Sequence, residues 1–73
     1  MDYRQKFHDL RIDHDLTQQD IADICKVSDA TVGHWESGRR EMRVDSIVKL
    51  CKYYNVSANY ILGLTDEYTP LNK

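Results

Sequence analysis

Residues 17–38, TQQDIADICKVSDATVGHWESG, constrain the fold of this chain more than any other segment. Thr17 is a good helix N-cap, and apolar residues follow it at helical spacing. Ser28 caps a second helix, which Gly38 ends because glycine readily adopts positive φ. Two helices of about two turns each are too short to be stable alone. The rest of the chain must therefore pack behind this pair and leave the second helix, residues 28–37, facing outward.

Three more helices are expected around this central pair. Asp2 can cap a helix over about residues 3–13, whose apolar residues fall on one face. A helix over about residues 44–54 follows the pair, and a short one over about residues 58–62 ends at Gly63. The side of the 44–54 helix that we expect to be buried consists of Val44, Ile47, Val48, Leu50, Cys51 and Tyr54.

The chain has no strand pattern, repeat or low-complexity segment, so the expected fold is all-α, a compact bundle of five helices. We place this domain at residues 1–66 and expect residues 67–73 to form a flexible tail. No apolar run approaches the roughly 20 residues of a membrane span, and no secretory pattern is present. These features predict a cytoplasmic protein that does not act at a membrane.

Residue types that often catalyse reactions or bind metals show no suitable spacing here. Cys25 and Cys51 lie 26 positions apart, and we expect both to be free thiols in the core. His8, His14 and His34 lack the spacing of a metal site. No nucleophile elbow, glycine-rich phosphate loop or paired carboxylates are recognisable, and so small a domain leaves little room for a pocket. We therefore expect no enzyme activity, cofactor, metal ion or small-molecule substrate.

The net charge is −2, but the charges are unevenly distributed along the chain. Residues 1–36 sum to −4, whereas residues 37–52 sum to +3 and include Arg39, Arg40 and Arg43. This positive segment directly follows the outward-facing helix of the central pair. A phosphate backbone that passed beside that helix would therefore meet positive charge.

Two runs, LTQQDIADICKVSDATVGHWESGRR and VDSIVKLCKYYNVSANYILGLTD, combine several specific features. These features are the Thr17-Gln18 start, the Val27-Ser28 turn, Trp35-Glu36 followed by Gly38, and Tyr60-Ile61-Leu62-Gly63. Together they resemble the Cro/CI-type (XRE, lambda-repressor-like) helix-turn-helix family over residues 7–66. The resemblance implies a lambda-repressor-like, sequence-specific DNA-binding domain that regulates transcription. Members of this length resemble phage or prophage Cro-like regulators, which act in genetic switches.

The resemblance also implies that residues 28–37 form a recognition helix in the major groove of double-stranded DNA. Base contacts would come from its outward positions, which are Asp29, Ala30, Gly33 and His34. Phosphate contacts would come from the start of the preceding helix and from the loop after the recognition helix, at Gln18, Arg39, Arg40 and Arg43.

Two further expectations follow from the resemblance. Arg11 and Glu36 match an ion pair that would fix the angle of the recognition helix on the first helix. A homodimer would form through Tyr60, Ile61 and Leu64, so that two half-sites lie about 34 Å apart on the DNA.

Departures from the family pattern keep a second function open. Lys26 stands where a turn glycine is common, and positive φ there would cost roughly 1 kcal/mol. Asp29 repels phosphates, and Gly33 removes a side chain from the outward face. Ile12 and Ile24 fall where the family usually has exposed polar residues. These positions favour the alternative of an antirepressor, which would bind a partner helix-turn-helix repressor through Ile12, Ile24 and Asp29.

Overall fold

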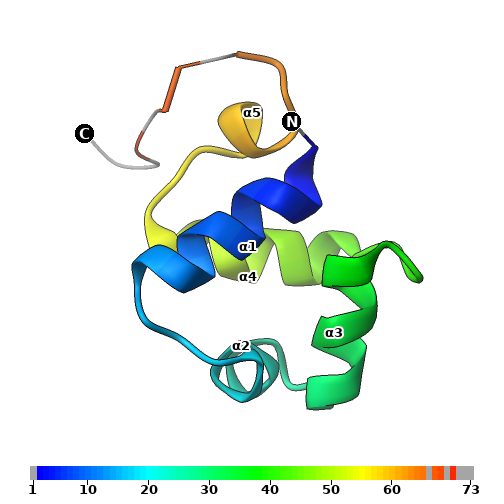
Figure 1. Ribbon diagram of the computed structural model, residues 1–73. Helices are drawn as coiled ribbons and strands as arrows, with labels where there is room; N and C mark the ends of the chain where they lie inside the picture. Colours follow the sequence, from blue (N-terminus) through cyan, green and yellow to red (C-terminus); the bar gives the residue numbers. More distant parts are fainter. Residues whose placement is uncertain (1, 66, 69, 71–73) are drawn as a thin grey trace.

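The computed structural model describes residues 2–65, 67, 68 and 70. Within them the chain forms five α-helices and no strand, which confirms the expected all-α fold. The helices are α1 (Tyr3–Asp13), α2 (Gln18–Cys25), α3 (Asp29–Ser37), α4 (Val44–Tyr54) and α5 (Ala58–Ile61). In Figure 1, α1 and α4 cross the middle of the molecule, α2 and α3 pack together at one end, and α5 lies at the other.

Residue 66, where we placed the end of the domain, lies outside the described residues, as do 69 and 71–73 of the expected tail. Among the described tail residues, Tyr68 packs edge-on against Tyr60, with their ring centroids 5.2 Å apart. No helix in the described part of the chain has the length and hydropathy needed to span a membrane.

Local hydrogen bonds start most of the helices where the sequence predicts. The Thr17 hydroxyl accepts from the Asp20 N–H at 3.1 Å, and the Asp20 carboxylate accepts from the Thr17 N–H at 2.8 Å. This reciprocal pair is a capping box, which satisfies two backbone donors that a helix start leaves free. Side chains also accept from the first turns of α1, α3 and α5, at Asp2, Ser28 and Ser57.

Left-handed residues end three of the helices. Gly38 follows α3 with a φ of 82°, and Asn55 follows α4 with a φ of 53°. Lys26 follows α2 with a φ of 60°, so this non-glycine residue keeps the left-handed conformation that the turn requires. α5 is one residue shorter than expected, because Leu62 caps it, and Gly63 then takes a φ of 81°.

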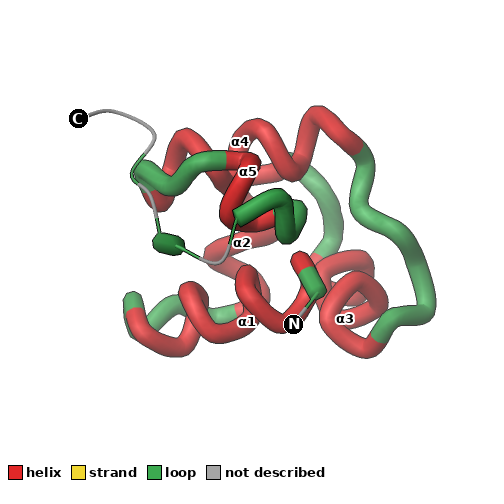
Figure 2. The backbone as a smooth tube through the Cα atoms, turned by 90° about the horizontal axis from the view of Figure 1, so that it is seen from above, coloured by secondary structure: helices red, strands yellow, loops and turns green. Residues whose placement is uncertain are grey.

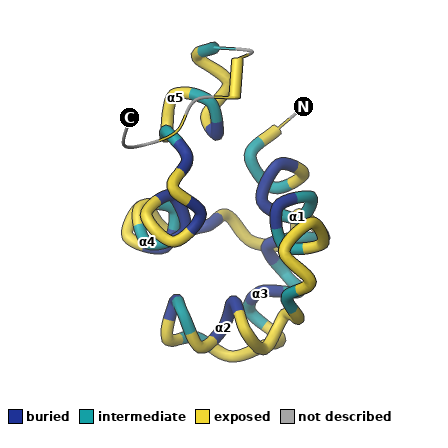
Figure 3. The backbone as a smooth tube through the Cα atoms, turned by 90° about the vertical axis from the view of Figure 1, so that its left-hand side faces the viewer, coloured by how far each residue is buried: buried dark blue, intermediate teal, exposed yellow. Residues whose placement is uncertain are grey.

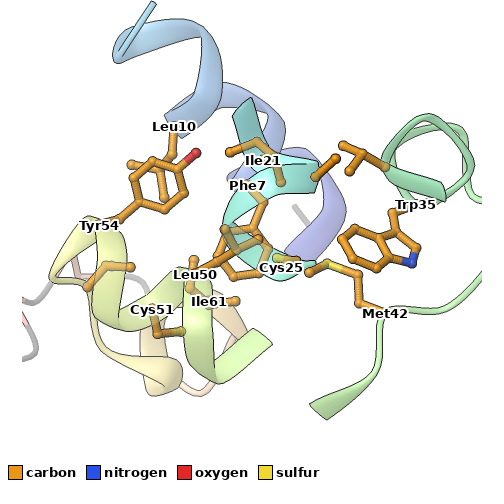
Figure 4. Close-up of a cluster of buried hydrophobic side chains, with 13 residues drawn as sticks. Phe7, Leu10, Ile21, Cys25, Trp35, Met42, Leu50, Cys51, Tyr54 and Ile61 are labelled. Carbon is orange, nitrogen blue, oxygen red and sulfur yellow. The ribbon is translucent and has the colours of Figure 1, made fainter. Parts of the chain in front are cut away.

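The core lies between the helices, and each helix contributes to it. Its buried members are Phe7, Leu10, Ile21, Ala22, Cys25, Val32, Trp35, Met42, Leu50, Cys51, Tyr54, Val56 and Ile61. Figure 3 shows these buried positions on the sides of the helices that face one another. Figure 4 shows Trp35 and Met42 next to each other at the edge of the cluster near α3. Both cysteines are buried free thiols, as predicted.

The structure corrects the expected buried side of α4. Val44 is 76% exposed and Val48 is 43% exposed, whereas Ser46 is buried. Each valine lies two residues from Ser46, and two residues of α-helix rotate the side chain by about 200°. The buried side of α4 therefore consists of Ser46, Leu50, Cys51 and Tyr54, and the two valines point away from it.

Two residues lie deeper than their expected contact roles require. Ile24 is half-buried and packs against the core, so of the two isoleucines named for a partner contact only Ile12, which is 51% exposed, lies fully on the surface. Ile61 is completely buried, because α5 turns this residue toward the body of the domain. Its side chain is therefore not available at a dimer interface, unlike those of Tyr60 and Leu64.

Candidate nucleic-acid interface

Helix α3 is anchored by one side and presents the other. Val32 and Trp35 are buried in the core, one turn apart. Asp29 and Ala30, in the first turn, are exposed, and Gly33 and His34 are half-buried. The four residues expected to read bases are therefore all reachable by solvent, and the most exposed of them lie at the start of the helix.

The turn between α2 and α3 is held by backbone hydrogen bonds. The Val27 N–H donates to the Ala22 carbonyl at 3.0 Å, which closes the left-handed turn at Lys26. The Ser28 hydroxyl then accepts from the Thr31 N–H at 3.2 Å and starts α3. These local hydrogen bonds hold the end of α2 next to the start of α3.

A half-buried ion pair fixes α3 to α1, as the resemblance implies. The Arg11 guanidinium donates to Glu36 through Nε at 2.7 Å and through Nη2 at 3.1 Å. Its Nη1 donates to the Leu16 carbonyl at 2.9 Å, so the same group also holds the loop before α2. The two side chains are only 13% and 16% exposed. Because the pair is bidentate and shielded from water, it defines the tilt of α3 more strictly than a surface ion pair would.

Gln18 joins this network from the start of α2. Its Nε2 donates to Glu36 Oε1 at 3.1 Å. Burial by itself raises the pKa of Glu36, but the hydrogen bonds from Arg11 and Gln18 and the Arg11 charge outweigh it and leave the pKa below its ordinary value. Glu36 is therefore a carboxylate at neutral pH and accepts from both partners.

The loop after α3 carries the three arginines expected to contact phosphates. Figure 2 shows this loop running along one edge of the molecule from α3 to α4. Arg39, Arg40 and Arg43 are all exposed. The backbone N–H groups of Arg39 and Arg40 both donate to the His34 carbonyl, which turns the chain away from α3. Arg43 makes a 3.5 Å contact with Asp45, but this pair is largely exposed.

Two residues of α1 hold the middle of this loop in place. Glu41 accepts hydrogen bonds from the Tyr3 hydroxyl at 2.9 Å and from the Arg4 guanidinium at 2.5 Å. The Tyr3 hydroxyl also accepts from the Met42 N–H at 3.1 Å, and the Met42 side chain is buried. The loop is therefore attached at its centre, while the arginine side chains on either side of that attachment extend into solvent.

Comparison with known proteins identifies the family. A family model described as "Helix-turn-helix" matches residues 7–61, which include α2, α3 and all of α4 and α5. The chain belongs to the helix-turn-helix family. This confirms the resemblance drawn from the sequence.

Three proteins with similar sequences are named as a regulator, an activator and a repressor of transcription. The chain is 35% identical over 68 residues to the HTH-type transcriptional regulator YobD of Bacillus subtilis (strain 168), covering 93% of this chain and 61% of that protein. It is 29% identical over 63 residues to the HTH-type transcriptional activator BcrR of Enterococcus faecalis, covering 86% and 31%. It is 32% identical over 54 residues to the cryptic phage CTXphi transcriptional repressor RstR of Vibrio cholerae, covering 74% and 49%. The chain thus spans less than two thirds of the length of each.

A solved structure supports the helix-turn-helix fold independently. The P22 c2 repressor, crystallised in complex with a synthetic operator, superposes with a TM-score of 0.75 at 19% sequence identity. The match covers 85% of this chain and 94% of the repressor chain. At this identity the likeness concerns the fold alone.

The expected dimer residues of the helix-turn-helix domain lie at the end opposite α2 and α3, around α5 (Figure 1). Tyr60 is half-buried, and Leu64 is 77% exposed. Leu62, which the sequence analysis did not select, is 53% exposed beside them. An apolar surface is therefore present near α5, although Ile61 belongs to the core instead.

Sequence reasoning missed the contacts of three residues of α1, two of which hold the loop after α3 and one of which holds α5. Tyr3 and Arg4 hold the loop after α3, as described above. Lys6 is buried, donates to the Tyr60 carbonyl through Nζ, and lies 4.5 Å from the centre of the Tyr60 ring. The sequence did contain an indication that Lys6 is buried, because this residue lies on the same side of α1 as the apolar residues Phe7 and Leu10. No comparable signal pointed to Arg4.

The described residues contain no group of three or more His, Cys, Asp or Glu side chains that could hold a metal ion. His8 Nδ1 lies 3.5 Å from the Asp9 carboxylate. His14 Nδ1 lies 2.8 Å from the Leu10 carbonyl, and its ring also packs against Tyr54. These histidines therefore have local partners within or next to α1.

Proposed function

We propose that this chain binds double-stranded DNA and regulates transcription, with α3 as its recognition helix. The observation that carries the proposal is the exposed first turn of α3, on a helix that has exposed polar donors next to it. Gln18 lies against the middle of α3 and binds Glu36, and Arg39, Arg40 and Arg43 follow in the exposed loop after the helix. Family membership supports the proposal, as do the relatives named as transcriptional regulators and the DNA-bound repressor with the same fold.

In this mechanism α3 enters the major groove and the flanking groups hold the phosphates. The exposed positions Asp29 and Ala30 meet base edges first, and His34 follows one turn later. An Asp carboxylate can accept a hydrogen bond from cytosine N4, and an alanine methyl can contact the thymine methyl. Because these groups offer few strong base contacts, a large share of the affinity comes from the arginines.

A homodimer would place two recognition helices on successive turns of the duplex. Tyr60, Leu62 and Leu64 supply the apolar surface for it near α5. The two α3 helices would then contact half-sites about 34 Å apart, and the operator would be close to palindromic. Such an arrangement would fit a repressor in a phage or prophage genetic switch.

Removing one loop arginine tests the phosphate contacts. The probe is a labelled duplex selected by the wild-type protein from a random-sequence pool, and fluorescence anisotropy gives the affinity between low and high salt. Arg39→Ala should weaken binding to every duplex and lower the slope of log K against log salt by about 0.9. The matched control is Lys52→Ala, which removes the same charge from an exposed position about 12 Å along α4 from its N-terminus. An unchanged slope for Arg39→Ala would remove this arginine from the interface.

The antirepressor remains a second candidate because Ile12 is exposed at the end of α1 beside the exposed carboxylates Asp13 and Asp15. An apolar residue among acidic groups suits a basic surface such as the DNA-binding face of another helix-turn-helix repressor. The half-buried position of Ile24 leaves less apolar area for this contact.

An experiment separates the DNA-binding function from the antirepressor function. This chain is added to a complex of the partner helix-turn-helix repressor with its operator. Release of the repressor from its DNA, and loss of that effect in Ile12→Ser, would favour the antirepressor. Binding of the selected duplex by this chain alone, with no effect on the repressor, would favour the DNA-binding function.

A further inference from the structure

We propose that Glu36 is a positioning residue for DNA, which orients the Gln18 amide so that one N–H of Gln18 is held by the protein and the other is left for a phosphate. This inference deepens the proposed function and rests on it. It concerns a contact between α2 and α3 that is separate from the Arg11–Glu36 pair, although it uses the same carboxylate.

The first step is the hydrogen bond between Gln18 and Glu36. Gln18 Nε2 lies 3.1 Å from Glu36 Oε1. An amide nitrogen carries two N–H donors, whereas a carboxylate only accepts. Glu36 therefore decides which end of the amide faces α3: the nitrogen is drawn toward it, and the amide oxygen is repelled.

The second N–H of the Gln18 amide remains free to bind a partner. Gln18 is the first residue of α2 and is exposed, so its second N–H is accessible to a partner. Without Glu36 the amide could rotate and present its oxygen, which would repel a phosphate. With Glu36 in place, the side chain and the unpaired backbone N–H groups of the first turn of α2 offer donors to the same anion.

Glu36 is itself held in place by Arg11. Arg11 binds both of its oxygens, and the carboxylate is only 16% exposed. A rigid acceptor is what an orienting role requires, because a mobile carboxylate would follow the amide instead of directing it. The chain of contacts thus runs from α1 through Glu36 to the exposed end of Gln18.

Gly33 provides the space in which Gln18 lies against α3. A Cβ atom built at Gly33 would stand 3.7 Å from both Nε2 and Oε1 of Gln18, which is ordinary van der Waals contact. The amide group therefore lies directly over this glycine. Alanine would fit there, but a longer side chain would have to share this space with the amide. Gly33, which supplies no side chain for base contacts, thus leaves the space that the Gln18 amide occupies.

The DNA assay uses a labelled random-sequence duplex of about 20 base pairs in about 50 mM salt, because a phosphate contact needs no specific sequence. Gln18→Ala should weaken binding by about tenfold, with the salt slope unchanged because Gln18 is neutral. The matched control is Gln19→Ala, which removes a neighbouring exposed glutamine whose amide binds Asp23, and its affinity should equal that of the wild type.

A double-mutant cycle separates orientation from a general structural effect. Glu36→Gln should weaken DNA binding more in the wild-type background than in the Gln18→Ala background, where only the effect of the broken Arg11 pair on the tilt of α3 remains. If Glu36 acted only through the tilt of α3, it would lower the affinity equally in both backgrounds, and the positioning role would be overturned. Circular dichroism establishes that each variant is folded before its affinity is measured.

A measurement on the free wild-type protein keeps the inference testable if Glu36→Gln does not fold. The side-chain NH₂ protons of Gln18 should show a nuclear Overhauser effect to the Gly33 α-protons, and these NH₂ signals should move when the random duplex is added. Absence of the effect would overturn the positioning role, as would equal affinity of wild type and Gln18→Ala. If the wild type bound no duplex at all, the proposed function would fail, and this role with it.

Discussion

The two ends of α3 are held very differently. At its C-terminal end Trp35 is buried and Glu36 is bound by Arg11 and Gln18. At its N-terminal end Asp29 and Ala30 are exposed, and the Ser28 side chain caps the helix. The helix is thus anchored by one end so that the other can meet a partner without reorganising. Changes at the anchored end should therefore alter stability strongly, and changes toward the exposed end should alter it little.

The largest effect is expected from breaking the anchor. Arg11→Ala leaves the half-buried Glu36 carboxylate without its main partner and should cost about 3 kcal/mol of the free energy of unfolding, the lower end of the range for buried pairs. Urea denaturation measures this loss. The matched control is Arg43→Ala, which breaks the exposed pair with Asp45 and should cost less than about 0.5 kcal/mol. Equal losses would show that the ion pair of Arg11 contributes no more than one on the surface.

The same anchor makes stability depend on pH. The folded-state pKa of Glu36 lies below its ordinary value of 4.5. Its contribution to stability should therefore be complete above about pH 4.5 and should be lost as the pH falls through the folded-state pKa. Urea midpoints measured in acid for the wild type and for Glu36→Gln test this, because the variant lacks the titrating group. Parallel pH profiles for the two proteins would contradict the assignment.

A smaller gain in stability is expected in the middle of α3. Gly33→Ala should raise the free energy of unfolding by about 0.5–1 kcal/mol, because glycine inside a helix has excess freedom in the unfolded chain. The new methyl group meets Gln18 only at van der Waals distance, so no rearrangement opposes the gain. Thermal unfolding measures the change. A loss of stability would show that the space over Gly33 is tighter than the contact indicates.

The smallest effect is expected in the turn before the exposed end. Lys26→Gly should stabilise the protein by about 0.5 kcal/mol, because relief of the left-handed strain exceeds the entropy cost of glycine. Gly38→Ala, at the turn after the anchored end, is the reverse experiment and should be destabilising, since that residue has a φ of 82°. Unfolding curves of both variants compare the two turns. A destabilised Lys26→Gly would show that the lysine side chain itself supports the turn.

The sequence predicted well those features that arise within a few residues. The caps at Asp2, Thr17 and Ser28 and the left-handed Gly38 all depend on atoms that lie next to one another along the chain. The pattern of apolar residues also located all five helices, to within one residue for α5.

Contacts between distant residues could not be predicted in the same way. The partial burial of Ile24, the burial of Ile61 and Lys6, and the exposure of Val44 and Val48 depend on how the helices rotate against one another. A hydrophobic pattern with a period of about 3.6 residues shows that a helix has an apolar side, but not where that side ends. Residues at its edge are therefore easily assigned to the wrong burial class.

In the candidate site, too, local features could be predicted from the sequence, whereas contacts between distant residues could not. The sequence by itself determined that a short helix would follow a tight turn and precede a loop of arginines, because caps, left-handed turns and helical periods are local. Only the tertiary structure decided that Gln18 meets Glu36 and that Glu41 is held by Tyr3 and Arg4. Those contacts join residues 18 to 38 positions apart in the chain. They exist only because the packed core fixes where the helices cross.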